Sequence, residues 1–235
     1  MTSTTSTDTL KHRAAVHAVD HFVRSGMVVG LGTGSTAAHA VVEIGARLRD
    51  GRLHDIVGIP TSEATARLAR ESGVPLTTLE ARPTVDVTID GADEVDPVLN
   101  LIKGLGGALL REKVVATASR RTVIIVDDSK RVARLGTRAP LPVEVVPFGW
   151  SIHLPFFQEL EAEPELRRLD DGRAFVTDNG HYIVDCRFPE GLQDPHAIAR
   201  ALDERPGIVE HGLFLNLATD VVIATPHGTE VVHRG

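Results

Sequence analysis

Residues with the chemistry of a binding or catalytic site collect in three short clusters, each containing glycine. They are Gly32-Thr33-Gly34-Ser35-Thr36, Asp90-Gly91-Ala92-Asp93 and Lys103-Gly104-Leu105-Gly106. Together they offer backbone N–H groups, hydroxyls, carboxylates and an ammonium group. Such groups hold anions and move protons, so the clusters indicate chemistry on a small anionic molecule.

The first cluster has the features of a loop that binds phosphate. Its glycines allow a tight turn and a close approach of the backbone to a ligand. A helix is expected to begin at Ser35 or Thr36, which leaves N–H groups and hydroxyls pointing outward. A dinucleotide site is the competing interpretation, but five residues after Gly30 stands Ser35 where the G-x-G-x-x-G fingerprint needs glycine. We therefore favour a small phosphate over NAD, with a plain tight turn as the remaining alternative.

The second cluster places two carboxylates, Asp90 and Asp93, around Gly91. Carboxylates this close can hold a divalent metal or exchange protons with hydroxyl groups, and an ordinary acidic turn is equally compatible. No further metal ligands stand at a recognisable spacing. His17 and His21 are four residues apart, as in some metal sites, but they lack a third ligand nearby. We therefore expect neither a metal nor a cofactor.

The third cluster opens with Lys103 and runs into a helix that carries Glu112 about one and a half turns from its start. The neighbours of Glu112 on this helix include four apolar residues, Leu109, Leu110, Val114 and Val115. A carboxylate in such surroundings can be partly desolvated, which raises its pKa toward that of a useful general base. A surface ion pair with Arg111 or Lys113 is the alternative, and the residues alone favour that simpler interpretation.

Short apolar runs alternate with segments of helical periodicity over the first 130 residues. Strands are expected at 27–31, 56–60, 75–79, 84–90 and 122–126, and helices at 9–23, 35–48, 62–72 and 106–118. This alternation is typical of a Rossmann-like α/β domain, with a mostly parallel sheet and helices on both faces. Ligands bind beyond the carboxyl ends of such strands. The polar residues after four strands, including Lys130 after the last, should therefore share one edge of the sheet.

The pattern changes near Pro140. Strands at 143–147, 173–177, 181–188 and 208–215, with helices at 151–161 and 195–204, give the order β-α-β-β-α-β of a small ferredoxin-like α+β domain. The turn at 177–180, TDNG, predicts a hairpin that joins the two middle strands. A last hairpin, 221–224 with 230–232, is expected to return to the first domain. The predicted domains are thus 1–140 plus 217–235, and 141–216.

Composition excludes several classes of protein. The net charge of −7 argues against general nucleic-acid binding, and no apolar run approaches the roughly 18 residues of a membrane span. The single cysteine, Cys186, excludes a disulfide framework and is expected to pack within a strand. Residues 1–9 are rich in Ser and Thr without an apolar core, so we expect a frayed tail and no secretion signal. A cytoplasmic location follows as an expectation.

Six motifs resemble those of the ribose-5-phosphate isomerase type A family. They are GLGTGSTA, DGADEVDP, KGLGGALLREK, DDSK, PLPVEVVPF and TDNG, in this order and at this spacing. The resemblance runs from about Lys11 to the C-terminus. It implies the interconversion of ribose 5-phosphate and ribulose 5-phosphate through an enediolate, as in the pentose phosphate pathway. It also implies a metal-independent homodimer or homotetramer whose partner molecule is a sugar phosphate.

The resemblance also implies a role for each matching residue. Glu112 matches the catalytic base, Lys103 lies against the substrate, and Asp90 and Asp93 contact the sugar and assist ring opening. The implied substrate-binding residues further include Thr33, Gly34, Ser35, Thr36, Gly91, Ala92, Gly104, Leu105, Gly106 and Lys130. Which of them hold the phosphate and which the hydroxyls stays open. Leu105 stands where the family commonly has glycine, and it would be strained if that backbone needs a positive φ.

Three rival functions remain on the sequence. The first is a non-catalytic sugar-phosphate-sensing domain, against which stand the lack of a helix-turn-helix segment or basic patch and the presence of Glu112. The second is an acyl-CoA transferase-like enzyme with a glutamate nucleophile, for which the chain is small. The third is an NAD enzyme, which the missing third glycine disfavours.

Overall fold

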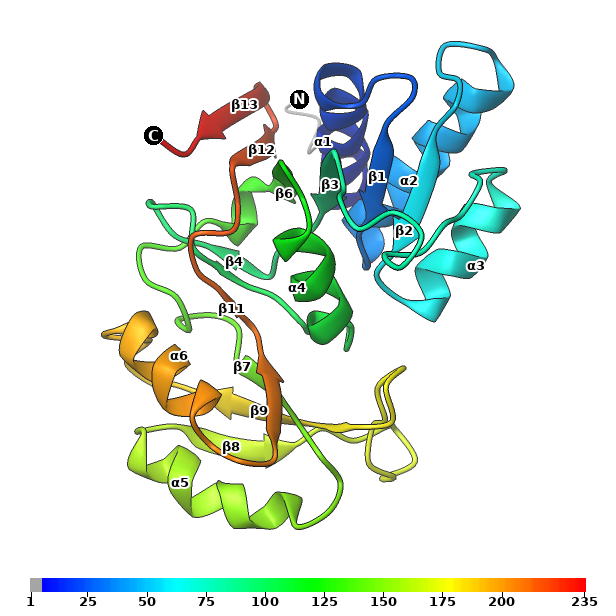
Figure 1. The fold of residues 1–235 in the computed structure, drawn as a ribbon. Helices are drawn as coiled ribbons and strands as arrows, with labels where there is room; N and C mark the ends of the chain where they lie inside the picture. The colour runs from blue at the N-terminus through cyan, green and yellow to red at the C-terminus, as the bar shows by residue number, and fades with distance from the viewer. Residues whose placement is uncertain (1–5) are drawn as a thin grey trace. The chain divides into compact units, whose positions relative to one another are not determined.

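A computed structural model describes residues 6–235 and divides the chain into two compact units (Figure 1). The first unit comprises the chain up to Ala92, Arg111–Lys130 and Asn216–Gly235; the second comprises Asp93–Leu110 and Arg131–Leu215. The predicted boundaries differ from these at residues 93–110 and 131–140, which lie in the second unit, and at Asn216, which lies in the first. The reason is local pairing, because two short strands at 94–95 and 101–102 join a sheet with Leu213–Phe214.

The first unit is built on a six-stranded sheet in the order β13-β12-β6-β3-β1-β2. Its strands are β1 (Val28–Leu31), β2 (Val57–Pro60), β3 (Val87–Asp90), β6 (Thr122–Asp127), β12 (Asp220–Thr225) and β13 (Gly228–His233). All neighbours pair in parallel except the hairpin of β12 and β13. The mostly parallel sheet is confirmed, and so is the return of the last hairpin to it. The strand expected at 75–79 is reduced to a single bridge between Leu76 and Gly58.

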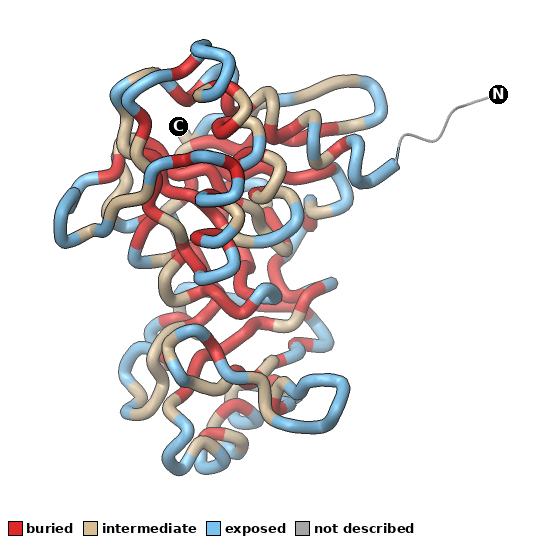
Figure 2. Tube along the Cα trace, turned by 90° about the vertical axis from the view of Figure 1, so that its right-hand side faces the viewer, coloured by how far each residue is buried: buried red, intermediate tan, exposed pale blue. Residues whose placement is uncertain are grey.

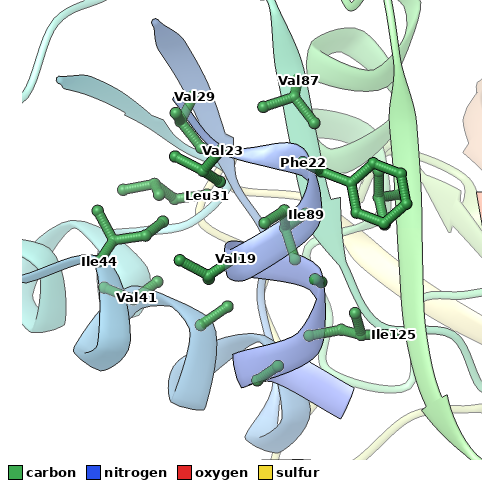
Figure 3. Close-up of a cluster of buried hydrophobic side chains, with 14 of the residues drawn as sticks. Val19, Phe22, Val23, Val29, Leu31, Val41, Ile44, Val87, Ile89 and Ile125 are labelled. Atoms are coloured by element: carbon green, nitrogen blue, oxygen red, sulfur yellow. The ribbon is translucent and has the colours of Figure 1, made fainter. Parts of the chain in front are cut away.

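Helices cover both faces of this sheet. They are α1 (Thr7–Phe22), α2 (Ser35–Arg49), α3 (Glu63–Glu71) and most of α4 (Leu109–Thr117). On one face, side chains of α1 and α2 pack against residues of β1 and β3, such as Leu31 and Ile89 (Figure 3). On the other face, Val115 of α4 packs with Ile59 and Val85. Gly30 makes the second contact possible, because a Cβ there would lie 2.8 Å from a methyl group of Val115.

Serine side chains define where two of these helices begin. Ser6 accepts a hydrogen bond from the Thr9 N–H at 3.2 Å and caps α1, and Ser62 accepts one from the Thr65 N–H at 3.0 Å and caps α3. Residues 7–9 of the expected frayed tail are therefore helical, while residues 1–5 lie outside the described chain. No helix within residues 6–235 is long and apolar enough to cross a membrane.

The second unit contains a four-stranded antiparallel sheet in the order β10-β7-β9-β8. Its elements are β7 (Leu141–Val145), the 3-10 helix η2 (Trp150–Ile152), α5 (His153–Glu159), β8 (Glu163–Leu166), β9 (Tyr182–Arg187), α6 (Pro195–Asp203) and β10 (Ile208–His211). The order β-α-β-β-α-β is confirmed. Buried residues of β7 and β9 pack against α5 and α6, and Cys186 is one of them, as expected. Figure 2 colours the buried parts of the chain red.

Two predicted strands of this unit are wrong. Residues 173–177 form no strand beyond an isolated bridge of Ala174 with Arg168, and β8 takes their place beside β9. The segment 208–215 splits between β10 and a separate three-stranded sheet. That sheet consists of β4 (Glu94–Val95), β5 (Leu101–Ile102) and β11 (Leu213–Phe214). Strands of two residues have no periodicity, so the sequence pattern did not reveal them.

The motifs PLPVEVVPF and TDNG meet inside the second unit. Glu144 of the first motif is fully buried, and one of its oxygens accepts hydrogen bonds from the second motif and the residue after it. The donors are Thr177 Oγ1 at 2.9 Å, Asn179 Nδ2 at 3.2 Å and His181 Nδ1 at 3.0 Å. The predicted turn forms, with the Gly180 N–H bonded to the Thr177 carbonyl at 2.9 Å. These two motifs therefore hold the fold of this unit together.

Candidate active site

Four loops of the first unit share the carboxyl edge of its sheet, as the sequence predicts. They follow β1, β2, β3 and β6, which are neighbours in the order β6-β3-β1-β2 and pair in parallel. The loop after β1 carries residues 32–36, the end of β3 carries Asp90, and the turn after β6 carries Lys130. The edge therefore gathers an acid, a lysine and the glycine-containing loop that the sequence predicts to bind an anion.

Asp90 is tied to the loop after β1. The residue is 2% exposed, and its Oδ1 accepts the backbone N–H groups of Thr33 at 3.1 Å and of Gly91 at 2.8 Å. Gly32 must be glycine for this contact, because a Cβ there would lie 2.2 Å from Asp90 Oδ1. The carboxylate thus has a defined orientation at the end of β3.

The hydroxyl of Thr33 belongs to an internal cluster of hydroxyl groups. Its Oγ1 lies 2.8 Å from Thr61 Oγ1, 2.9 Å from Ser62 Oγ and 3.1 Å from Thr65 Oγ1. Thr65 also donates to the Gly32 carbonyl at 3.0 Å. The Thr33 side chain therefore stabilises the loop. In the sequence the partners of Thr33 stand out only as a polar run after β2, which by itself indicates no role.

The N-terminus of α2 has the properties of an anion site. The helix begins at Ser35 after Gly34, whose φ of 106° is a conformation that favours glycine, and no side chain caps its first turn. Lys11 of α1 donates from Nζ to Ser35 Oγ at 2.9 Å, which brings a positive charge to the same place. Sequence reasoning missed Lys11, because it lies 24 residues before Ser35 on another helix.

Lys130 ends a short 3-10 helix, η1 (Asp128–Lys130), after β6. Asp127 is buried and its Oδ1 accepts hydrogen bonds from the backbone N–H and the hydroxyl of Ser129. The Lys130 residue is half-buried. The DDSK motif is therefore a turn that Asp127 stabilises and that presents a lysine.

Glu112 lies in the first turn of α4 and is 4% exposed. Glu112 is therefore not an exposed surface side chain. Its neighbour Arg111 pairs with Glu63 at 2.9 Å on the surface of the first unit. Glu112 is thus a carboxylate largely removed from bulk water, which is one of the environments in which carboxylates act as general bases.

Lys103 belongs to the second unit and is 3% exposed. Its N–H donates to the Gly212 carbonyl at 2.9 Å, and its Nζ lies 5.3 Å from the centre of the Phe214 ring. A cation over an aromatic face is attracted by the ring quadrupole. The ammonium group is therefore held inside the protein by elements that are remote in sequence.

The glycine turn after Lys103 does not strain Leu105. The positive φ angles fall on Gly104 (107°) and Gly107 (79°), and Leu105 is not among the residues with positive φ. The Leu105 N–H donates to Asp93 Oδ2 at 3.0 Å, and the side chain is 44% exposed. The expected strain at Leu105 is therefore absent. The Asp93 carboxylate stabilises this turn through its hydrogen bond with the Leu105 N–H.

The predicted residues thus fall into two groups. The first unit holds Thr33, Gly34, Ser35, Thr36, Asp90, Gly91, Ala92, Glu112 and Lys130, and the second unit holds Asp93, Lys103, Gly104, Leu105 and Gly106. Within each unit the contacts above join the members of different motifs.

One group of side chains in the described chain has the spacing of metal ligands: Asp203, Glu210 and His211. His211 Nδ1 accepts the Leu213 N–H at 3.2 Å, so the neutral ring carries its proton on Nε2, which faces Asp203 at 3.2 Å. A metal there would have to displace that proton. None of the predicted site residues belongs to this group, and metal independence stays a prediction.

Comparison with known proteins identifies the family. Residues 57–228 match the family model described as ribose 5-phosphate isomerase A (phosphoriboisomerase A). The chain is 56% identical to ribose-5-phosphate isomerase A of Chloroflexus aurantiacus over 98% of its own length and 95% of that protein. It is 51% identical to the probable ribose-5-phosphate isomerase 2 of Arabidopsis thaliana, over 97% and 87% of the two chains.

Solved structures agree with this assignment. Ribose 5-phosphate isomerase from Plasmodium falciparum superposes with a TM-score of 0.93 at 40% identity, covering 96% of this chain and 98% of that one. A D-ribose-5-phosphate isomerase in complex with phospho-erythronic acid superposes with a TM-score of 0.95 at 38% identity, covering 98% and 100%. The chain therefore belongs to the ribose 5-phosphate isomerase A family.

Proposed function

We propose that this protein interconverts ribose 5-phosphate and ribulose 5-phosphate. The observation that carries the proposal is its 56% identity, over nearly the whole chain, to a relative named ribose-5-phosphate isomerase A. The related isomerase solved with phospho-erythronic acid, a four-carbon acid phosphate, supports a sugar phosphate as the ligand. The reaction belongs to the pentose phosphate pathway, as the family implies.

The phosphate group is assigned to the N-terminus of α2. The uncapped N–H groups that follow Gly34 and the hydroxyls of Ser35 and Thr36 suit a phosphate dianion, because a helix N-terminus carries a partial positive charge. Lys11, at 2.9 Å from Ser35 Oγ, supplies a full charge, and Lys130 supplies a second from the same edge of the sheet.

Proton transfer is assigned to Glu112. The base removes the proton from carbon-2 of the open-chain aldose, and the carbonyl at carbon-1 becomes part of an enediolate. Return of the proton to carbon-1, with transfer of the hydroxyl proton from oxygen-2 to oxygen-1, gives the ketose. The burial of Glu112 supports this role, because a poorly solvated carboxylate is a stronger base toward carbon.

Lys103 and the N–H groups of the glycine turn are assigned to the developing oxyanion. A buried ammonium group stabilises such a charge more than a solvated one does, because the local dielectric constant is lower. Asp90 and Asp93 are assigned to the sugar hydroxyls, where a carboxylate can carry the proton that moves when the furanose ring opens.

We propose three further properties: a cytoplasmic location, a homodimer or homotetramer, and activity without a metal or cofactor. They rest on the family resemblance. A chelation experiment, described in the Discussion, addresses the last of them.

The direct experiment is to incubate the purified protein with ribose 5-phosphate and follow the ketose by 13C NMR. We expect an equilibrium mixture of the two sugar phosphates within minutes at micromolar protein. Binding of ribose 5-phosphate by calorimetry without any ketose would instead favour the sugar-phosphate-sensing alternative.

A further inference from the structure

Arg167 follows β8 and contacts the turn that carries Lys103. Its Nη1 donates to the carbonyl of Gly104 at 3.0 Å and to that of Leu105 at 3.1 Å. A single guanidinium nitrogen therefore binds two successive carbonyl groups. The sequence around Arg167 does not predict this contact, because the two partners are more than 60 residues apart.

The guanidinium of Arg167 is itself held in place from two sides. Asp185 of β9 accepts from Nε at 2.8 Å and from Nη2 at 2.5 Å, which is the two-point pairing that a lysine cannot make. The Phe175 ring lies 5.7 Å from the guanidinium carbon. The side chains of Arg167 and Asp185 are only 13% and 22% exposed, so solvent screens this pair weakly.

Phe175 also closes the far end of the same turn. Gly107 has a φ of 79°, and a Cβ built on it would lie 2.5 Å from Phe175 Cζ. The ring therefore occupies the space beside Gly107, while the Gly107 N–H bonds the Gly104 carbonyl at 3.0 Å. The turn is thus bounded by Arg167 on its carbonyl side and by Phe175 at Gly107.

These contacts set the directions of two peptide groups. In the peptide that joins Gly104 and Leu105, the carbonyl faces Arg167 and the N–H faces Asp93 Oδ2 at 3.0 Å. In the next peptide, the Leu105 carbonyl faces Arg167. Because a trans peptide places its N–H opposite its carbonyl, the Gly106 N–H is directed away from the guanidinium. Among residues 6–235 no acceptor is bonded to this N–H.

We propose that Arg167, held by Asp185, is a positioning residue that presents the Gly106 N–H to the oxyanion of the enediolate. The proposal rests on the isomerase function proposed above. Two carbonyl oxygens in a turn beside a developing oxyanion would repel it, and Arg167 draws both to its own side. A donor oriented before the reaction costs no reorganisation when charge develops, which is how such groups accelerate a reaction.

The test compares Arg167→Lys with Arg168→Lys. The lysine at 167 keeps the charge but cannot bind Asp185 at two points and both carbonyls together. Arg168 is the matched control, since it is adjacent and exposed and donates to the Gly172 carbonyl at 2.8 Å, outside the Lys103 turn. We expect Arg167→Lys to lower kcat about tenfold, a fraction of the effect of deleting an oxyanion donor, and to leave KM within about twofold. Arg168→Lys should match the wild type.

Inhibition by phospho-erythronate distinguishes a positioning role of Arg167 from a purely structural one. The planar carboxylate of phospho-erythronate carries negative charge as the enediolate does. Its inhibition constant should therefore rise about tenfold in Arg167→Lys, in step with the loss of kcat. Asp185→Asn, which loosens the guanidinium, should show the same pattern with a smaller loss. If thermal unfolding shows that Arg167→Lys is unfolded at the assay temperature, Asp185→Asn is compared with the wild type in its place.

The outcomes separate the two proposals. If the wild type and Arg168→Lys produce no ketose, the isomerase function fails and this inference fails with it. If both are active and a folded Arg167→Lys or Asp185→Asn keeps the wild-type kcat and inhibition constant, only the positioning role is overturned. A change confined to KM would overturn it as well.

Discussion

Oδ1 of Asp90 accepts a hydrogen bond from the backbone N–H of Thr33 at 3.1 Å. This bond joins the acid at the end of β3 to the loop of residues 32–36 after the adjacent strand β1. Two motifs that are 57 residues apart are thereby held in one arrangement. The proposed chemistry depends on that arrangement, because the loop would hold the phosphate while Asp90 contacts the sugar.

Gly32→Ala should disturb this contact directly. The added methyl would lie 2.2 Å from Asp90 Oδ1 and 2.6 Å from its Cα, so the backbone must shift. We expect a loss of about 1–3 kcal/mol in the free energy of unfolding, as for other overpacked sites, together with a raised KM for ribose 5-phosphate. Urea unfolding measures the first effect. Gly91→Ala is the control for stability, because the nearest heavy atom to its added methyl is 4.0 Å away.

Replacing two buried or half-buried lysines should give opposite kinetic patterns. Lys103→Met removes a charge assigned to the transition state, so kcat should fall by about 10²–10³ with little change in KM. Lys11→Met removes a charge assigned to the phosphate, so KM should rise about tenfold with a smaller change in kcat. Steady-state kinetics of the two variants decide the matter. If Lys103→Met changed KM alone, Lys103 would be a ground-state binding residue.

The sequence predicts those strands and site residues that depend on local patterns, and it does not predict contacts between residues far apart in the chain. The parallel sheet was predictable because the runs 28–31 and 123–126 contain no polar side chain. Strand β8 was not, because Glu163 and Glu165 are exposed and Pro164 is tolerated only at an edge. Residues 173–177 have the apolar character of a strand, but Phe175 packs beside Gly107 instead.

The same distinction holds at the site. The glycine loops and the acids were visible as local motifs, and the family resemblance gave them roles. Lys11, the hydroxyl cluster around Thr33 and the Arg167 contact join residues that are 24 to 63 positions apart, so no local pattern reports them. The burial of Glu112 was likewise not predictable from its charged neighbours, which favoured a surface position.

Acid should destabilise the first unit through Asp220. Burial raises the pKa of this carboxyl, but hydrogen bonds from Arg121, Thr219 and His233 outweigh burial and lower its pKa to about 2 from 3.8. A group whose pKa is depressed on folding stabilises the protein above its unfolded pKa. That contribution, at most about 2 kcal/mol, is lost as the pH falls from about 4 to about 2.

Asp220→Asn tests this contribution. The variant should be less stable than the wild type at pH 7, and the difference should shrink as the pH falls below 4. Asp171→Asn is the matched control, because Asp171 pairs with Arg173 on the surface, where ion pairs contribute little. A constant difference between the Asp220 variant and the wild type from pH 7 to pH 2 would contradict the account.

Activity should survive chelation. None of the residues assigned to the reaction belongs to the described group with metal-ligand spacing, Asp203, Glu210 and His211. After dialysis against EDTA and removal of the chelator, we expect kcat within about 20% of its starting value, since proton transfer by a carboxylate needs no metal. Loss of turnover that a divalent ion restores would show that the reaction requires a metal.

The most direct test of the central claim is the activity of Glu112→Gln. The amide keeps the shape of the side chain but cannot accept a proton, so kcat should fall by about 10²–10⁴ while thermal unfolding and phospho-erythronate binding stay near the wild type. Glu71→Gln, the same change on an exposed residue of α3, should leave kcat unchanged. In D2O, the exchange of solvent deuterium into the sugar, read by NMR, should slow in parallel. A folded Glu112→Gln protein with near-normal turnover and exchange would show that another group moves the proton.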